Sequence, residues 1–142
     1  MAKDGIDWDT IPTGAIVVVD SAPIIYLLED HPVLAPRFVG LFEAEAAGRI
    51  QIAISTLTIA EVLTGPCQRG ADALARRYEK ALLQFSVVPV NAEIAVSASR
   101  LRVRYKLRLP DAIQLATALE IGAHALVTHD RDFAKVRGFL IL

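Results

Sequence analysis

One stretch of the chain constrains its fold more than any other, because residues 11–28 contain a single charged side chain. That side chain is Asp20, and the same stretch holds Pro12, Gly14 and Pro23. A carboxylate at the middle of a membrane costs roughly 2.5–3.5 kcal/mol, so we do not interpret the stretch as a membrane span. It is better explained as the buried core of a folded domain, in which Asp20 has a particular task.

Short aliphatic runs alternate with helical patterns along the whole chain. Residues 15–19 form a β-branched run bounded by glycine and aspartate, which is typical of a buried strand. By the same criteria we predict strands at 15–19, 50–54, 87–90, 125–128 and 139–142, and helices from Ser21 to Leu28, from Pro36 to Gly48, at 56–63 before Gly65-Pro66, at 71–85, at 92–105 and at 110–122. This alternation favours an α/β sandwich around a mainly parallel sheet of about five strands.

Length and composition are consistent with one domain. The 142 residues are 54% hydrophobic, with a mean hydropathy of +0.42, whereas only 6% are aromatic. Helices packed on aliphatic strands account for such a composition. We therefore expect a single domain at 15–142, preceded by an N-terminal extension at 1–14 in which Trp8 is the candidate docking residue.

The charge balance excludes a globally basic nucleic-acid-binding protein. Lys and Arg number 15 and Asp and Glu 16, which gives a net charge of -1. Any anionic partner must therefore be held by a local basic patch or by a metal ion. The single cysteine, Cys67, cannot form an intramolecular disulfide bond, which agrees with a reducing cytoplasm.

Four acidic residues recur at the ends of predicted strands. Asp20 directly follows the first strand, and Glu61 lies in the helix after the second. Asp111 lies in the first turn of the helix at 110–122, and Asp130 follows the strand at 125–128. The carboxyl ends of parallel strands line one edge of a sheet, where ligands bind. Four carboxylates gathered there would repel one another unless a cation neutralised them.

Each acid also has a purely structural interpretation at the start of a helix. These interpretations explain every position singly, but not why an acid recurs at the same edge in apolar surroundings. Asp20 could be the N-cap of the next helix, and Glu61 could form a capping box with Thr58. Asp111 would interact favourably with the helix dipole, and Asp130 or Asp132 could cap the turn at 133–135.

The chemistry that four such carboxylates favour is metal-assisted hydrolysis of a phosphodiester. Mg²⁺ and Mn²⁺ prefer oxygen ligands and leave positions open for water and phosphate. Zinc spacing is absent, because His31, His124 and His129 are scattered along the sequence. The sequence also has no glycine-rich phosphate loop, no D-x-D motif at Asp20 and no G-x-S-x-G motif.

Four sequence blocks resemble the motifs of the PIN domain family. They occur in the family's order and with similar spacing over nearly the whole chain, and the likeness is greatest to VapC-type ribonuclease toxins. The blocks are VVVDSAPIIYLLE, STLTIAEVL, LRLPDAIQLATAL and LVTHDRDF.

The resemblance implies a three-layer α/β/α fold and a ribonuclease that depends on one or two Mg²⁺ or Mn²⁺ ions, with water as the nucleophile. Matched motif to motif, Asp20, Glu61 and Asp111 fall on the family's metal-binding acids. Asp130 falls on the fourth acid, for which Asp132 is an alternative.

The resemblance also implies supporting residues and partners. Thr128 matches a small hydroxyl residue that supports the site, and Ser21 is a further candidate beside it. The implied partners are an RNA substrate, a small antitoxin that covers the acidic pocket, and a second copy of the chain bound through the helices after the second strand. The implied location is the cytoplasm.

A basic run leads up to Asp111 and has two interpretations. The run has no acid within it and leads directly to Asp111; its members are Arg100, Arg102, Arg104, Lys106 and Arg108. They could bind RNA phosphates beside the acids. Alternatively, they form the solvated end of a helix, where cations are favoured.

Two other functions remain open from the sequence. A housekeeping RNA-processing nuclease would use the same fold and the same acids. A catalytically silent PIN module would bind RNA or protein without cleaving it.

Overall fold

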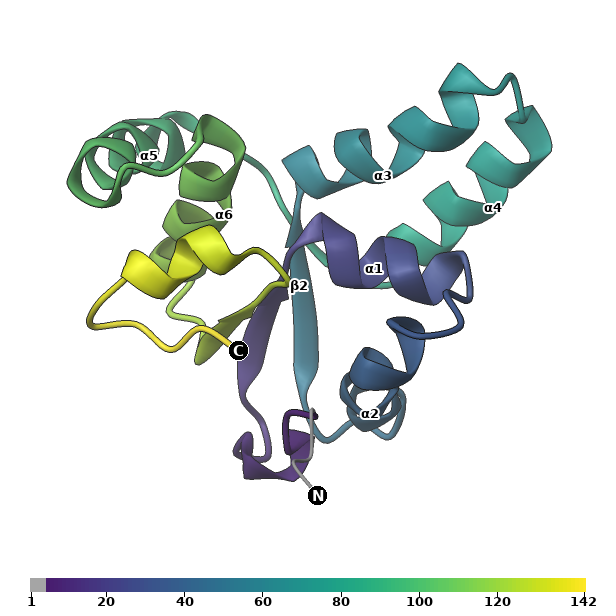
Figure 1. Ribbon diagram of the computed structural model, residues 1–142, viewed down its shortest axis with the longest axis horizontal. Coiled ribbons are helices and arrows are strands. Elements are labelled where there is room, and N and C mark those ends of the chain that lie inside the picture. Colours follow the sequence, from purple (N-terminus) through teal and green to yellow (C-terminus); the bar gives the residue numbers. More distant parts are fainter. Residues whose placement is uncertain (1–4) are drawn as a thin grey trace.

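The computed structural model describes residues 5–142, so positions 1–4 of the predicted extension lie outside the described residues. Strands and helices alternate along the described chain, as the sequence predicts (Figure 1). The strands are β1 (Ile16–Val19), β2 (Gln51–Ser55), β3 (Ser86–Val88) and β4 (Ala125–Val127). The helices are α1 (Ser21–Leu28), α2 (Ala35–Ala46), α3 (Thr56–Gln68), α4 (Asp72–Leu82), α5 (Ala92–Tyr105) and α6 (Leu109–Glu120), with 3₁₀ turns η1 (Trp8–Thr10) and η2 (Arg131–Lys135).

The strands form one parallel sheet in the order β3-β2-β1-β4. In register, Val18 of β1 lies between Ala53 of β2 and Leu126 of β4. β3 lies at one edge of the sheet, as Pro89 directly after it predicts. Because all the strands run in the same direction, their carboxyl ends meet along one edge.

The predicted fifth strand is wrong for the described residues. Residues 139–142 form only one isolated bridge, between Ile141 and Leu126, beside β4. The chain reaches β4 after a turn at Gly138, whose φ is +78°. Only the last residues therefore lie within hydrogen-bonding distance, with the Leu142 amide donating to the Leu126 carbonyl at 2.9 Å. The sheet has four strands within residues 5–142.

The two faces of the sheet bury alternate side chains. Val17 and Val19 of β1 belong to a core shared with α1, α2, α3 and α4. Val18 belongs to a second core, shared with α5 and α6. Figure 1 shows these two groups of helices on opposite sides of the sheet, which is the three-layer arrangement. Strands buried on both faces explain the continuous apolar runs of the sequence.

The apolar stretch at 11–28 is divided between β1 and α1, with Asp20 at the junction. Val17, Val18, Val19 and Ile24 have no exposed surface. Across residues 5–142, no helix combines the length and the apolar character that crossing a membrane requires.

α3 is longer than the sequence predicts. We expect it to end at Gly65-Pro66, but it continues to Gln68 with Pro66 buried inside it. A proline so near the end of a helix removes one backbone hydrogen bond, and the following residues only complete the last turn. α3 packs against α4, and together they form a hairpin that projects from the sheet (Figure 1).

Other predicted boundaries differ from the structure by a few residues. The helix predicted at 71–85 spans Asp72–Leu82, and the strand predicted at 87–90 spans Ser86–Val88. Shifts of this size are expected, because the ends of helices and strands depend on local hydrogen bonds.

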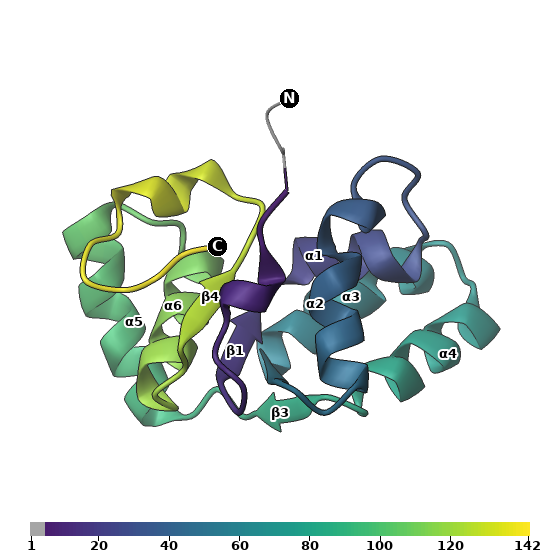
Figure 2. The same cartoon turned by 90° about the horizontal axis from the view of Figure 1, so that it is seen from below.

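The N-terminal segment docks on the domain through Trp8. The indole is 7% exposed, and its Nε1 donates to the Arg37 carbonyl at 3.2 Å. The Arg49 guanidinium donates to the carbonyls of Trp8 at 2.8 Å and Ile11 at 2.6 Å. Figure 2 shows this segment beside the amino end of β1, the end of the sheet opposite to the acids.

Gly40→Ala is expected to destabilise the domain by about 1–2 kcal/mol, through overpacking. A Cβ at Gly40 would lie 2.7 Å from Cδ1 of Trp8. The matched variant Gly65→Ala, in α3, meets no atom within 4 Å. It should stabilise the domain by up to about 1 kcal/mol through helix propensity. Urea unfolding measures both variants, and equal effects would contradict the docking of Trp8.

Candidate active site

Asp20 lies at the carboxyl end of the central strand β1 and is 8% exposed. Its Oδ1 accepts the Ser21 amide at 2.8 Å, so Asp20 is the N-cap residue of α1. Its Oδ2 accepts the Thr128 hydroxyl at 2.9 Å, across from β4. Asp20 therefore caps a helix and also faces the sheet edge. The structural and functional interpretations of this residue do not exclude each other.

Glu61 lies within α3, and its predicted structural role is wrong. The N-cap of α3 is Ser55, whose side chain accepts the Thr58 amide, so Thr58 and Glu61 do not form a capping box. The half-buried Glu61 instead accepts the Ser21 hydroxyl through Oε1 at 3.3 Å. Ser21 thus joins the start of α1 to the acid on α3.

Asp111 lies in the first turn of α6, as predicted, and is 5% exposed. Arg108 directly precedes the helix and reaches back over its first turn. Its Nε donates to Asp111 Oδ2 at 3.2 Å, and a terminal nitrogen donates to Asp130 Oδ2 at 2.9 Å. The Arg108 side chain remains 70% exposed.

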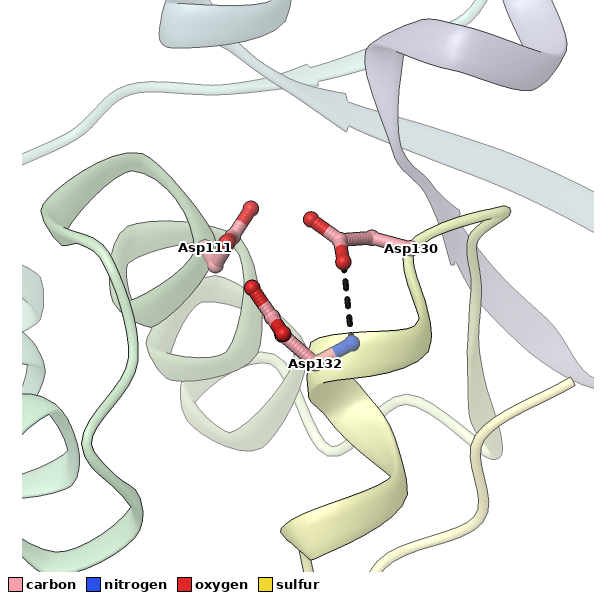
Figure 3. A group of neighbouring side chains, drawn as sticks. All are labelled: Asp111, Asp130 and Asp132. Atoms are coloured by element: carbon pink, nitrogen blue, oxygen red, sulfur yellow. Dashed lines mark hydrogen bonds between the residues drawn. The ribbon is translucent and has the colours of Figure 1, made fainter.

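Asp130 and Asp132 flank the start of η2, on the loop after β4. Asp130 Oδ1 accepts the Asp132 amide at 2.9 Å, and the Asp130 amide donates to Thr128 Oγ1 at 3.0 Å. One carboxylate oxygen each of Asp111, Asp130 and Asp132 lie within 4.8 Å of one another (Figure 3). Both alternatives for the fourth acid are therefore close to Asp111.

A cavity of about 510 Å³ lies at this edge of the sheet. Asp132 is not part of its lining, whereas Asp130 is. A larger hollow, of about 920 Å³, lies beside Trp8 and Arg49 and contains none of the predicted site residues. Among the residues that line the smaller cavity are Asp20, Ser21, Glu61, Arg108, Asp111 and Asp130.

Three carboxyl groups of this cavity have a raised pKa, those of Asp20, Glu61 and Asp111. Burial, followed by the negative charge of Asp130, raises the pKa of Asp111 to about 6, although Arg108 acts in the opposite direction. Burial also raises the pKa of Asp20, against the hydrogen bonds from Ser21 and Thr128. For Glu61, burial and then the charge of Asp20 raise the pKa. An all-oxygen donor set with excess negative charge fits a divalent cation of the Mg²⁺ or Mn²⁺ kind.

The basic run separates into two parts. α5 ends at Tyr105, and Lys106 adopts a left-handed conformation with φ 53°, which turns the chain toward α6. Arg108 lies beyond this turn and lines the cavity. The other members are exposed and do not line it; they are Arg100, Arg102, Arg104 and Lys106.

A buried glutamine that sequence reasoning missed links two of the acid-bearing helices. Gln114 of α6 is 1% exposed. Its Oε1 accepts the Ser55 hydroxyl at 3.0 Å, and its Nε2 donates to Thr58 Oγ1 at 2.7 Å. A signal was present in the sequence, because Gln114 is a polar residue between Ile113 and Leu115 in a largely apolar block.

Tyr26 and His129 also line the cavity and are not among the predicted site residues. The Tyr26 hydroxyl and His129 Nδ1 are 2.8 Å apart, which fixes the imidazole against α1. His129 lies between Thr128 and Asp130, so its place in the fourth block was the available signal.

A parallel sheet with acidic side chains at its carboxyl edge defines the class: α/β proteins whose ligand site lies at the ends of the strands. Within that class, the PIN domain model matches residues 17–138, so the chain belongs to the PIN domain family. This confirms the family predicted from the four blocks. Among curated proteins, no sequence matches the chain.

Several solved structures are similar to this chain. A chain of a toxin–antitoxin complex from Klebsiella pneumoniae is 31% identical, with a TM-score of 0.70 over 89% of this chain and 95% of that one. A chain of VapBC2 from Rickettsia felis, bound to a promoter DNA fragment, is 18% identical, with a TM-score of 0.72 over 89% of this chain and 97% of that one. VapC20 from Mycobacterium tuberculosis, a sarcin–ricin loop cleaving toxin, is 20% identical, with a TM-score of 0.67 over 87% of this chain and 96% of that one. The latter two show the shared fold alone.

Proposed function

We propose that this chain is a divalent-metal-dependent endoribonuclease and the toxin of a toxin–antitoxin pair. The observation that carries the proposal is a single cavity lined by four carboxylates, three of which have a raised pKa. Membership of the PIN domain family and the likeness to toxin–antitoxin chains support it.

Asp20, Glu61, Asp111 and Asp130, which line the cavity, would hold one or two Mg²⁺ or Mn²⁺ ions. When bound, the ion supplies a Lewis acid that favours deprotonation of water and offsets charge developing on the phosphate. The Thr128 hydroxyl and the Ser21 amide hold the Asp20 carboxylate in a fixed orientation. No protein nucleophile is required, because water is the attacking group.

The test is cleavage of a fluorescent RNA by the purified chain with Mn²⁺ or Mg²⁺. We expect cleavage with either ion, none with EDTA, and micromolar to millimolar binding of Mn²⁺ in calorimetry. A chain that binds Mn²⁺ and cuts DNA but not RNA would contradict the substrate class. A chain that binds no Mn²⁺ would be the silent module instead.

Asp130→Asn is expected to lower RNA cleavage about 100-fold, because Asp130 lines the cavity and faces Asp111. Asp132→Asn is expected to lower it less than about tenfold, because Asp132 is exposed and outside the cavity lining. Initial rates at saturating Mn²⁺ measure both variants. A larger loss for Asp132→Asn would make Asp132 the fourth acid.

The proposed partners are a small antitoxin over the acidic cavity and a second copy of the chain bound through α3 and α4, both in the cytoplasm. Overexpression should arrest growth, and co-expression of a short neighbouring reading frame should relieve the arrest. Light scattering after size exclusion tests the dimer. Unaffected growth with an active ribonuclease would favour the housekeeping nuclease.

A further inference from the structure

Arg108 occupies the space between two acids that we have proposed as metal ligands. Its Nε lies 3.2 Å from Asp111 Oδ2 and its terminal nitrogen 2.9 Å from Asp130 Oδ2. Figure 3 shows that Asp111 and Asp130 come from different elements and face one another. The guanidinium thus joins α6 to the loop after β4.

A guanidinium and a divalent ion held by the same two carboxylates repel each other, because both are positively charged and only a few ångströms apart. The guanidinium lies 2.9 Å from Asp130 Oδ2, and Mg²⁺ would need its carboxylate oxygens at about 2.0–2.1 Å, so the two cations would share one small space. A doubly charged compact ion also compensates crowded carboxylates better than one delocalised positive charge. Arg108 and the ion must therefore compete for Asp111 and Asp130.

The Arg108 side chain is placed so that it can leave. It is 70% exposed, and exposed ion pairs are weak. It follows the left-handed turn at Lys106, outside any helix, at the rim of the cavity. Its departure would disturb no packed core.

We propose that Arg108 is the resident counter-cation of the metal-free site, that a divalent ion displaces it from Asp111 and Asp130, and that the freed guanidinium then binds a phosphate of the RNA. This rests on the proposed function. A planar guanidinium matches two phosphate oxygens, and it stands at the entrance of a cavity whose acids otherwise repel RNA. The residue therefore couples loading of the ion to substrate binding.

The first experiment is Mn²⁺ calorimetry on the full chain in three forms: wild type, Arg108→Gln and the matched control Arg76→Gln. Arg76 is exposed on α4 and does not line the cavity. Removing the competing guanidinium should tighten Mn²⁺ binding about three- to thirtyfold, the range of two exposed ion pairs, while Arg76→Gln stays at the wild-type value. Equal or weaker Mn²⁺ binding by Arg108→Gln would overturn the displacement.

The second experiment measures binding of a cleavage-resistant 2′-O-methyl RNA at saturating Mn²⁺. Arg108→Gln should weaken binding about five- to fiftyfold and reduce the slope of log K against log salt by about 0.7, the contribution of one phosphate contact. Arg108→Lys should be intermediate, because its charge remains but the planar fork is lost. RNA affinity equal to that of Arg76→Gln would overturn the phosphate contact.

These outcomes separate the two proposals. If wild type cleaves RNA but Arg108→Gln binds Mn²⁺ no more tightly than wild type, the proposed displacement of Arg108 is wrong and the proposed ribonuclease activity is supported. If wild type and Arg108→Gln both fail to bind Mn²⁺, the proposed function and this inference are both wrong.

Discussion

Asp111→Asn is expected to lower RNA cleavage about a thousandfold or more. The variant removes a carboxylate from the lining of the acidic cavity, and several kcal/mol of transition-state stabilisation by a bound ion depend on such ligands. Asparagine has nearly the same shape and keeps an oxygen, so the fold should be retained. The loss is therefore chemical.

The same variant is expected to stabilise the metal-free protein at neutral pH. The pKa of Asp111 is raised from 3.8 to about 6 in the folded state. The stability that follows from a raised carboxyl pKa is fully present below 3.8 and is lost as the pH rises through about 6. Asparagine does not titrate, so the free energy of unfolding of the variant rises above that of wild type between these two pH values, and the difference is complete at pH 7. We expect a difference of roughly 1–2 kcal/mol after allowance for solvent screening and the lost Arg108 contact.

Activity and stability should thus change in opposite directions. Cleavage assays at pH 7.5 with Mn²⁺, and urea unfolding in EDTA at pH 4 and pH 7.5, measure both effects. Saturating Mn²⁺ should stabilise wild type but not the variant. A variant less stable than wild type at pH 7.5 in EDTA would contradict the electrostatic strain, and retained cleavage would contradict the role of Asp111.

Gln114→Ala is expected to destabilise the domain by about 2–4 kcal/mol. The truncation leaves a cavity at a fully buried position and removes the hydrogen bonds that Gln114 makes with Ser55 and Thr58, which are themselves buried. The expected effect is large for a polar residue because three hydroxyl and amide groups are satisfied together.

The matched control is Gln68→Ala, at an exposed position near the end of α3, which should change stability by no more than about 0.5 kcal/mol. Urea unfolding with circular dichroism compares the two. Amide hydrogen exchange at the start of α3 should also accelerate in Gln114→Ala, because Ser55 caps that helix. Similar stabilities of the two variants would show that the buried network is dispensable.

The fold could be predicted from the sequence because local signals and tertiary position agree over most of the chain. The β-branched run of β1 and the proline at the start of α1 each specify one structure. Prediction failed where a long-range contact decides the outcome. α3 continues past Gly65-Pro66 because it packs on α4, and residues 139–142 stop short of a strand because Gly138 delays their approach to β4.

The site could be predicted in part for a similar reason. Asp20 and Asp130 follow adjacent parallel strands, so the sheet places them at one edge. The residues that contact these acids are brought to them by the tertiary structure. Arg108 and Asp111 are three residues apart, but neither the bridge from Arg108 to Asp130 nor the link from Gln114 to Ser55 has a periodic signature.

The pairing of β1 with β4 has a consequence for the order of events during translation. The amide of Asp20 and its carboxylate both depend on a segment about a hundred residues later, through the Val127 carbonyl and the Thr128 hydroxyl. Closing so long a loop is entropically slow, and it cannot begin before β4 has been synthesised. A nascent chain therefore carries separate, unassembled acids while the ribosome is reading its message. The nuclease we propose would become active only after β4 and Thr128 have been translated.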